Sequence, residues 1–165
     1  MITISKATVE DFTSIREIAH KTWPVAYGKI LSKAQLDYML EKMYSLESLN
    51  DNLTNKGHHF LMVNEDAVSV GFASFEHHYW NEKCTRLHKI YLLPETQGKG
   101  LGKLLLGKIM ALAKENNSDV ISLNVNRFNK AYAFYKKMGF EVLGEEDIKI
   151  GNGYLMEDFK MEKKI

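Results

Sequence analysis

Apolar residues in the first third of the chain recur at helical spacing. Residues 2–6 form a short β-type segment, after which Phe12, Ile15 and Ile18 fall on one face of a helix. Thr8 to Asp11 resembles a capping box, a pattern that marks the start of a helix. Similar patterns predict further helices from residue 33 and over residues 46–52.

The second part of the chain alternates between β-rich and helical segments. Residues 59–64 and 67–76 are β-rich and flank Glu65-Asp66, which predicts a hairpin. The remaining expected elements are strands at 86–93, 120–125, 139–143 and 154–161 and helices at 100–116 and 129–138. Because no linker-like stretch interrupts this order, it predicts a single α/β domain over residues 1–165, layered around a mixed sheet.

Composition narrows the class of protein. The chain has 165 residues and a formal net charge of +1, so no global field attracts it to nucleic acid or to an anionic membrane. Its single cysteine, Cys84, excludes an intrachain disulfide and a cysteine-based zinc site. The N-terminus lacks a signal-peptide pattern, and no apolar run approaches the ~20 residues of a membrane span. We therefore expect a cytoplasmic protein without nucleic-acid or membrane partners.

The most informative stretch is a glycine-rich turn between a strand and a helix, Gln97-Gly98-Lys99-Gly100-Leu101-Gly102-Lys103. A helix N-terminus offers free N–H groups, and glycines let a ligand approach the backbone, so this turn suits a phosphate group. The P-loop motif does not fit, because Gln97 and Leu104 stand where it needs Gly and Ser or Thr. The dinucleotide fingerprint fails at Lys103, where it needs Gly. The alternative is a turn that only packs the helix against the sheet.

Two sequence blocks carry a family resemblance. Gln97-x-x-Gly100-x-Gly102, after a strand ending in Tyr-Leu-Leu-Pro-Glu, resembles the acetyl-CoA signature of the GNAT superfamily of N-acetyltransferases. Residues 129–140, Asn-Lys-Ala-Tyr-Ala-Phe-Tyr-Lys-Lys-Met-Gly-Phe, are similar to a second block of that superfamily. Within it, the chain looks most like small bacterial enzymes of the spermidine/spermine (polyamine) acetyltransferase type. The resemblance implies a mixed, largely antiparallel central sheet with helices on both faces and splayed central strands.

The resemblance also implies how acetyl-CoA is held as the co-substrate. Acetyl-CoA would lie between the splayed strands 86–93 and 120–125, pairing with the backbone of one strand and leaving its pyrophosphate on the glycine turn. The residues assigned to it are Ile90, Tyr91, Leu92, Gln97, Gly98, Lys99, Gly100, Leu101, Gly102, Lys103, Asn124 and Asn129. The lysines can equally be solvated, and the asparagines can equally cap a helix or satisfy a sheet edge.

By the same resemblance, Tyr135 would protonate the departing thiolate. A phenol of pKa ~10 is a usable acid for this step, and the alternative is a purely packing role. Relatives often carry a glutamate base on the strand before the glycine turn, where this chain has His88. Histidine, with an ordinary pKa of ~6.5, is a competent base near neutral pH. The other candidates for the base are Glu76, His77 and His78.

We expect no metal, because His58-His59 and His77-His78 are adjacent pairs and neighbours in a strand point to opposite faces. The resemblance places the acceptor against residues 23–44. Aromatic and acidic side chains in that segment suit a cationic amine; they are Trp23, Tyr27, Tyr38, Tyr44, Asp37 and Glu41. The alternative is an amphipathic helix pair with a polar outer face.

The function that the resemblance implies is acetyl-CoA-dependent N-acetyl transfer to a primary amine, either a small amine or a polyamine. One alternative is an enzyme of the same fold that acetylates a protein N-terminus or a lysine. Another is a non-catalytic acyl-CoA-binding regulatory domain, against which the presence of Tyr135 argues. The sequence names neither the amine nor the oligomeric state, although the final strands allow two copies to pair as a homodimer.

Overall fold

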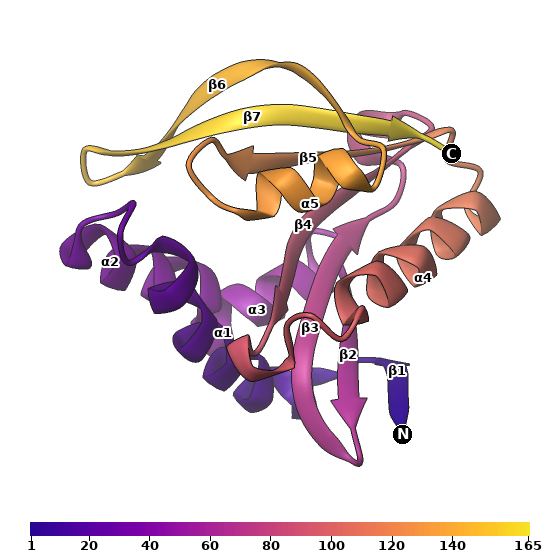
Figure 1. The fold of residues 1–165 in the computed structure, drawn as a ribbon, viewed down its shortest axis with the longest axis horizontal. Coiled ribbons are helices and arrows are strands. Elements are labelled where there is room, and N and C mark those ends of the chain that lie inside the picture. The colour runs from indigo at the N-terminus through magenta and orange to yellow at the C-terminus, as the bar shows by residue number, and fades with distance from the viewer.

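Seven strands form one sheet in the computed structural model, which describes residues 1–165 (Figure 1). They are β1 (Ile2–Lys6), β2 (His59–Glu65), β3 (Val68–Glu76), β4 (Cys84–Leu92), β5 (Val120–Asn126), β6 (Glu141–Gly151) and β7 (Tyr154–Lys164). Their order across the sheet is β1-β2-β3-β4-β5-β7-β6, and every neighbouring pair is antiparallel except β4 and β5. The predicted mixed, largely antiparallel sheet is therefore confirmed.

Helices cover both faces of the sheet, as predicted (Figure 1). One face carries α1 (Phe12–Tyr27), α2 (Lys33–Tyr44) and α3 (Leu46–Thr54), and the other carries α4 (Leu101–Glu115) and α5 (Ala131–Lys137). Tyr91 and Leu92 are neighbours in β4 and point to opposite faces. The ring of Tyr91 lies 5.8 Å from that of Trp23 in α1, whereas the side chain of Leu92 lies beside Gly102 in α4. None of the helices is both long and apolar enough to cross a membrane.

The helix starts follow local signals in the sequence. Asp11 Oδ2 accepts the backbone N–H of Thr8 at 2.8 Å, which completes the predicted capping box at the start of the short 3₁₀ helix Val9–Asp11 that leads into α1. Ser32 Oγ accepts the N–H of Gln35 at 3.1 Å and caps α2. Each bond satisfies a backbone donor at a helix start that has no partner within the helix.

The two central strands separate part-way along their length. β4 and β5 pair only between Cys84–Arg86 and Val120–Ser122. Beyond Arg86, β4 stays paired with β3 as far as Leu92, and β5 stays paired with β7 as far as Asn126. The predicted splay is therefore confirmed, and it opens a gap in the middle of the sheet.

The final hairpin is longer than predicted. The sequence indicates strands at 139–143 and 154–161, but β6 runs from Glu141 to Gly151 and β7 from Tyr154 to Lys164. The acidic segment 145–147 is exposed and gives no apolar signal, so backbone pairing with β7 holds it in the sheet. Of the two final strands, β7 lies between β5 and β6, so only β6 has a free edge to which a second copy could pair. The homodimer itself stays a prediction.

Candidate active site

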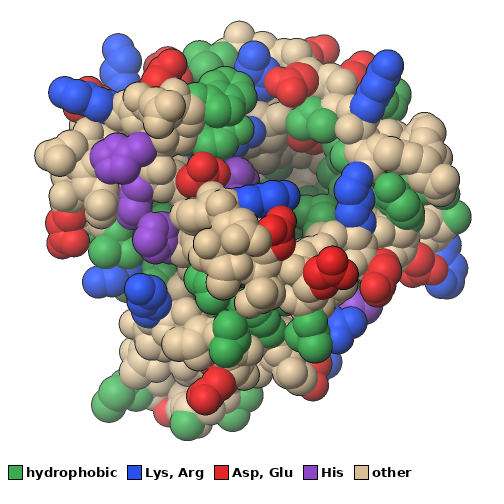
Figure 2. All heavy atoms as spheres, turned by 180° about the vertical axis from the view of Figure 1, so that it is seen from behind, with side chains coloured by type: hydrophobic (Ala, Val, Ile, Leu, Met, Phe, Trp, Pro, Cys, Tyr) green, Lys and Arg blue, Asp and Glu red, His purple; other side chains and the backbone are tan.

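A cavity of about 220 Å³ occupies the gap between β4 and β5. Its walls come from residues 87–91 of β4, residues 123–126 of β5, helices α1, α2 and α5, and the β6–β7 hairpin. On the face seen in Figure 2 the surface is hollowed, with hydrophobic side chains in the hollow and charged side chains and a histidine around it. A mostly apolar space with a few polar groups is typical of a small-molecule site.

The backbone of β4 presents free hydrogen-bonding groups to this gap. Ile90, Tyr91 and Leu92 pair with Ala73, Phe72 and Gly71 of β3 on one side. On the other side β5 has already diverged, so half of the polar groups of this segment face the gap without a strand partner. An extended chain of amides such as pantetheine can use those groups as an added strand would.

The glycine turn leads directly into α4. Gly98 and Gly100 have φ values of +85° and +77°, in the left-handed region that glycine adopts freely. Gly100 is the N-cap residue and offers no side-chain cap, so the first N–H groups of α4 have no partner within the helix. A Cβ at Gly102 would lie 3.3 Å from the ring of Phe134, because α4 approaches α5 closely there. Free donors at a positive helix end fit a pyrophosphate.

We expect Gly100→Val to weaken coenzyme A binding at least about tenfold, because it disturbs charge-assisted bonds worth about 1.5–3 kcal/mol. A β-branched residue also costs about 1–2 kcal/mol in the left-handed region, whereas asparagine tolerates it. Gly100→Asn is therefore the matched control, with coenzyme A affinity near that of the wild type. Calorimetric titration measures both variants, and unchanged affinity in a folded Gly100→Val protein would count against this site.

The side chains of the turn contribute less than the backbone does. Lys99 Nζ lies 3.2 Å from Glu65 Oε1, so it is engaged by β2. Leu101 is buried in the core, and the Gln97 N–H donates to the Pro94 carbonyl at 3.2 Å. Lys103 lines a shallow groove together with Gly100, where its charge can reach a phosphate.

Tyr135 lies on α5, lines the cavity and is buried. Its ring packs against those of Phe134 and Phe140 at centroid distances of 5.3 and 5.6 Å. Burial raises the pKa of the Tyr135 phenol, so the hydroxyl keeps its proton near neutral pH. The packing role and the proton-donor role predicted for this residue are therefore compatible.

A β-bulge sets the position of His88. Ser74 pairs with Lys89 whereas Phe75 pairs with Leu87, so His88 is the extra residue of β4. A bulge breaks the alternation of strand faces and re-aims a side chain, so the direction of His88 does not follow from strand alternation. His88 lines the cavity, and its Nε2 lies 2.9 Å from Glu76 Oε1.

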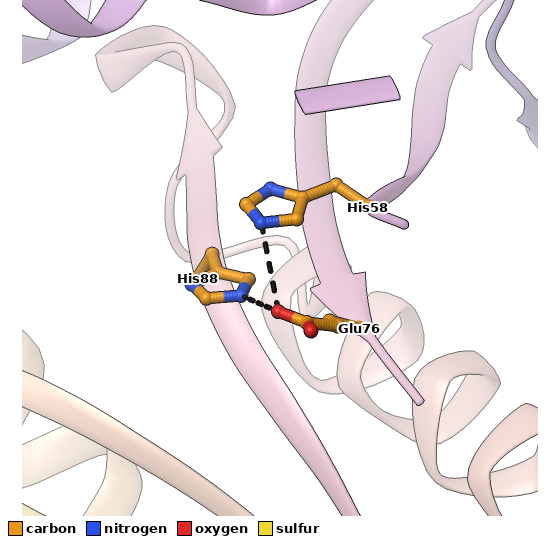
Figure 3. A group of neighbouring side chains, drawn as sticks. All are labelled: His58, Glu76 and His88. Atoms are coloured by element: carbon orange, nitrogen blue, oxygen red, sulfur yellow. Dashed lines mark hydrogen bonds and ion pairs between the residues drawn. The ribbon is translucent and has the colours of Figure 1, made fainter. Parts of the chain in front are cut away.

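His88, Glu76 and His58 form one cluster beside the cavity (Figure 3). Glu76 Oε1 also lies 3.6 Å from His58 Nε2, and the two imidazole rings are stacked at 4.0 Å. Burial lowers the pKa of His88. Burial also lowers the pKa of His58 to about 4, and the nearby charge of Lys89 adds a smaller effect in the same direction. The pKa of Glu76 is raised by burial. Both imidazoles are therefore neutral near neutral pH, and each can share a proton with the carboxylate.

The same cluster offers three metal-ligating atoms within 4.8 Å of one another. This combination is not an adjacent histidine pair, because its three members come from separate segments of the chain. The ring planes of His58 and His88 are only 10° apart, and a nitrogen lone pair lies in its ring plane, so the two lone pairs do not converge on one ion. The cluster suits proton transfer better than metal binding, and the absence of a metal stays a prediction.

The remaining base candidates lie outside the cavity. His77 Nδ1 lies 2.8 Å from Thr85 Oγ1, which fixes its ring to β4. His78 is exposed and has a φ value of +52° in the connection between β3 and β4. Of the four candidates, His88 lines the cavity and Glu76 reaches it through His88.

The predicted acceptor residues divide into two groups. Trp23 and Tyr27 line the cavity, and the Tyr27 hydroxyl lies 3.0 Å from that of Tyr91. The other four lie outside the lining: Tyr44 is a core residue, Tyr38 packs on Tyr154, Asp37 pairs with Lys33, and Glu41 is exposed.

Asn124 and Asn129 both line the cavity. Asn129 Oδ1 accepts the N–H of Ala131 at 3.0 Å, which is the predicted capping contact. Asp158 of β7 also lines the cavity and was missed from the sequence. It stands two residues after the buried Met156, and a carboxylate at an inward position of an alternating strand is a signal that could have found it.

Comparison with known proteins places this geometry among acetyltransferases. Residues 12–140 match the acetyltransferase (GNAT) family. A spermidine N(1)-acetyltransferase from Thermoplasma acidophilum is 29% identical over 168 residues, 99% of this chain and 97% of that protein. A ribosomal protein bS18-alanine N-acetyltransferase from Haemophilus influenzae is 33% identical over 110 residues, 61% of this chain and 73% of that protein.

A solved structure shares the fold over its whole length. The crystal structure of PaiA N-acetyltransferase from Thermoplasma acidophilum in complex with coenzyme A has a TM-score of 0.84 to this chain. The two are 29% identical, and the match covers 100% of this chain and 99% of the other. The splayed sheet described above is thus also the architecture of a protein solved with coenzyme A.

Proposed function

Because the chain belongs to the acetyltransferase (GNAT) family, we propose that it acetylates a small aliphatic amine of the polyamine type. It is an N-acetyltransferase with acetyl-CoA as its co-substrate. The similarity to a spermidine N(1)-acetyltransferase supports the choice of acceptor. The observation that carries the proposal is the mostly apolar cavity in the splay, with Tyr135 and His88 both in its lining.

The proposed reaction transfers an acetyl group from sulfur to nitrogen. The acceptor arrives as an ammonium ion, with a pKa near ~10.4 for a lysine-like amine, and must lose one proton to attack. The nitrogen then bonds to the thioester carbonyl carbon and gives up its second proton, the C–S bond breaks, and the thiolate takes a proton from Tyr135. The acetylated amine leaves neutral, and one proton is released to solvent for each turnover once Tyr135 is reprotonated.

We assign the base to His88, supported by Glu76. Burial keeps the imidazole neutral, so a lone pair is available throughout the neutral range. As the imidazole takes a proton, Glu76 Oε1 at 2.9 Å stabilises the positive charge that develops. His58, stacked on His88, limits the ring to one orientation.

A protein acceptor is the second candidate function. The bS18-alanine N-acetyltransferase among the similar proteins favours it, since that enzyme's name records a protein substrate. The two candidates differ in what must reach the cavity, a short alkylamine or the end of an extended peptide.

The decisive experiment measures release of free thiol from acetyl-CoA across a panel of acceptors. The panel contains spermidine, shorter alkylamines and a peptide with an N-terminal alanine. We expect turnover with the alkylamines and little with the peptide. Turnover with the peptide but not with the alkylamines would favour the second candidate. If none of the acceptors in the panel gives release of thiol, the proposal is contradicted.

Coenzyme A should stabilise the folded protein far more than NAD or ATP does. The glycine turn fits neither the dinucleotide fingerprint nor the P-loop motif, although it offers free N–H groups. A ligand at ~100 times its dissociation constant adds roughly 2.7 kcal/mol to the free energy of unfolding. A thermal-shift screen checks this, and no shift with coenzyme A would remove the assigned co-substrate site.

A further inference from the structure

Asp158 supplies the only carboxylate in the lining of the cavity. Its side chain is buried, with 6% of the residue exposed, and its Oδ1 has no hydrogen-bond partner. Burying a carboxylate oxygen without a partner costs free energy, and chains usually avoid that cost by pairing the group. An unpaired acceptor in the wall of a ligand cavity therefore points to a partner that arrives with the ligand.

The two arginines that lower the pKa of Asp158 form their hydrogen bonds to other groups. Arg127 Nη1 donates to the Asp158 backbone carbonyl at 3.3 Å, while its Nη2 lies 3.2 Å from Asp147 Oδ1. Arg86 Nη1 donates to Ser122 Oγ at 3.3 Å. The structure contains no ion pair to the Asp158 carboxylate.

Lys89, the only other charged residue in the lining, also has partners of its own. Its Nζ lies 5.7 Å from the ring centroid of Tyr44 and 5.9 Å from that of Phe60. These are cation–π distances, so the ammonium group is held beside the rings of Tyr44 and Phe60. The cavity therefore holds one carboxylate that forms no ion pair with a cation of the protein.

Burial raises the pKa of Asp158 to about 6, and Asn124, by hydrogen bonding to the carboxylate, opposes that rise. Glu146 raises the pKa further, and Arg86 and Arg127 lower it. The carboxylate is thus mostly ionised at neutral pH and is protonated as the solution becomes mildly acidic.

We propose that Asp158 is the acceptor-recognition site, where its free carboxylate oxygen binds a positively charged nitrogen of the acceptor. This assignment rests on the proposed function and specifies the chemistry of the acceptor, an alkylammonium ion. Met39 and Met43 of α2 line the same cavity and suit the alkyl chain, and Trp23 adds an aromatic wall. Asp158 acts here as a specificity-determining residue, separate from the proton transfers assigned to His88 and Tyr135.

The test removes the charge and keeps the shape. Asp158→Asn should raise KM for spermidine by about 10- to 100-fold, the loss of one charge-assisted hydrogen bond. Affinity for coenzyme A, measured by calorimetry, should stay unchanged. The melting temperature should hold or rise, because a buried unpaired charge is removed. Glu157→Gln is the matched control, since it removes the same charge from the exposed neighbour in β7.

An acceptor without charge separates recognition from general damage. An alkoxyamine such as O-methylhydroxylamine is uncharged at neutral pH, so its acetylation should change little in Asp158→Asn. Equal losses with spermidine and with the alkoxyamine would make Asp158 a structural residue and overturn the assignment. Unchanged KM for spermidine would overturn it as well.

A direct measurement of spermidine binding can fail or succeed independently of acetyl transfer, so it tests the Asp158 assignment separately from the proposed function. Calorimetry of the coenzyme A-loaded protein should show that spermidine binds the wild type and binds Asp158→Asn much more weakly. If the wild type binds no spermidine, the Asp158 assignment fails even where thiol release with another acceptor upholds the acetyltransferase. If spermidine binds through Asp158 but no acetyl transfer occurs, the recognition site stands and the proposed function fails.

Discussion

Tyr135→Phe should lower kcat by about 10²–10⁴-fold, the usual loss when a general acid is removed. The phenylalanine ring keeps the packing against Phe134 and Phe140, so the fold and coenzyme A affinity should be retained. Only the hydroxyl that we propose as the proton donor to the departing thiolate is lost. Steady-state kinetics with acetyl-CoA and spermidine, together with a coenzyme A titration, measure the two effects separately.

Tyr132→Phe is the matched control for this experiment. Tyr132 lies on the same helix, packs on Phe159 at 4.8 Å and does not line the cavity, so its variant should keep the wild-type rate. Wild-type turnover in Tyr135→Phe would return Tyr135 to a packing role, and the thiolate would then take its proton from water.

Replacing His88 should give the second large effect, a loss of about 10²–10⁴-fold in kcat/KM at neutral pH. His88→Gln can still donate an N–H to Glu76 but has no basic nitrogen, so it should lose as much as His88→Ala. His88→Glu should retain more activity than either, because a carboxylate can accept the proton. Raising the pH should partly restore the Gln and Ala variants as free amine accumulates.

The direction of the His88 pKa shift fixes the expected pH profile of the wild type. Because burial lowers this pKa, the imidazole keeps its lone pair as the pH falls below its ordinary value of ~6.5. The rate in mild acid should therefore follow the protonation of the amine and of Asp158, with no separate loss near pH ~6.5 from His88. His77→Ala is the control, since His77 bonds to Thr85 outside the cavity. A His88→Gln variant that keeps the wild-type kcat/KM at neutral pH would show that the proton leaves by another route.

Local sequence signals determined most of the elements of this protein. The capping residues Thr8 and Ser32 begin helices where the pattern predicts them, and β1, α4 and β5 lie within one or two residues of their predicted bounds. These features depend on contacts between near neighbours, so they can be read from the chain alone. The glycine turn belongs here too, because positive φ values at Gly98 and Gly100 are the conformations that glycine favours.

Tertiary structure decided how the chemistry is assembled. The length of β6 comes from backbone pairing with β7. This pairing does not require apolar side chains, so the exposed acidic segment of β6 carries no apolar pattern that would reveal it. The direction of His88 comes from a bulge, and a bulge depends on the register between two strands that no local spacing records. Its contacts with Glu76 and His58 join three separate segments for the same reason.

Asp158 shows most directly what could not be predicted from the sequence alone. Its place in an alternating strand is visible in the chain, but its lack of a charged partner depends on residues from several other segments. Arg127, Arg86 and Lys89 each had to be bound elsewhere for the carboxylate to stay free. The sequence by itself determined the elements, the family resemblance and the glycine turn, because each rests on residues close together in the chain. Only the folded structure decided which charges remain unpaired, because pairing depends on distances between residues far apart in the chain.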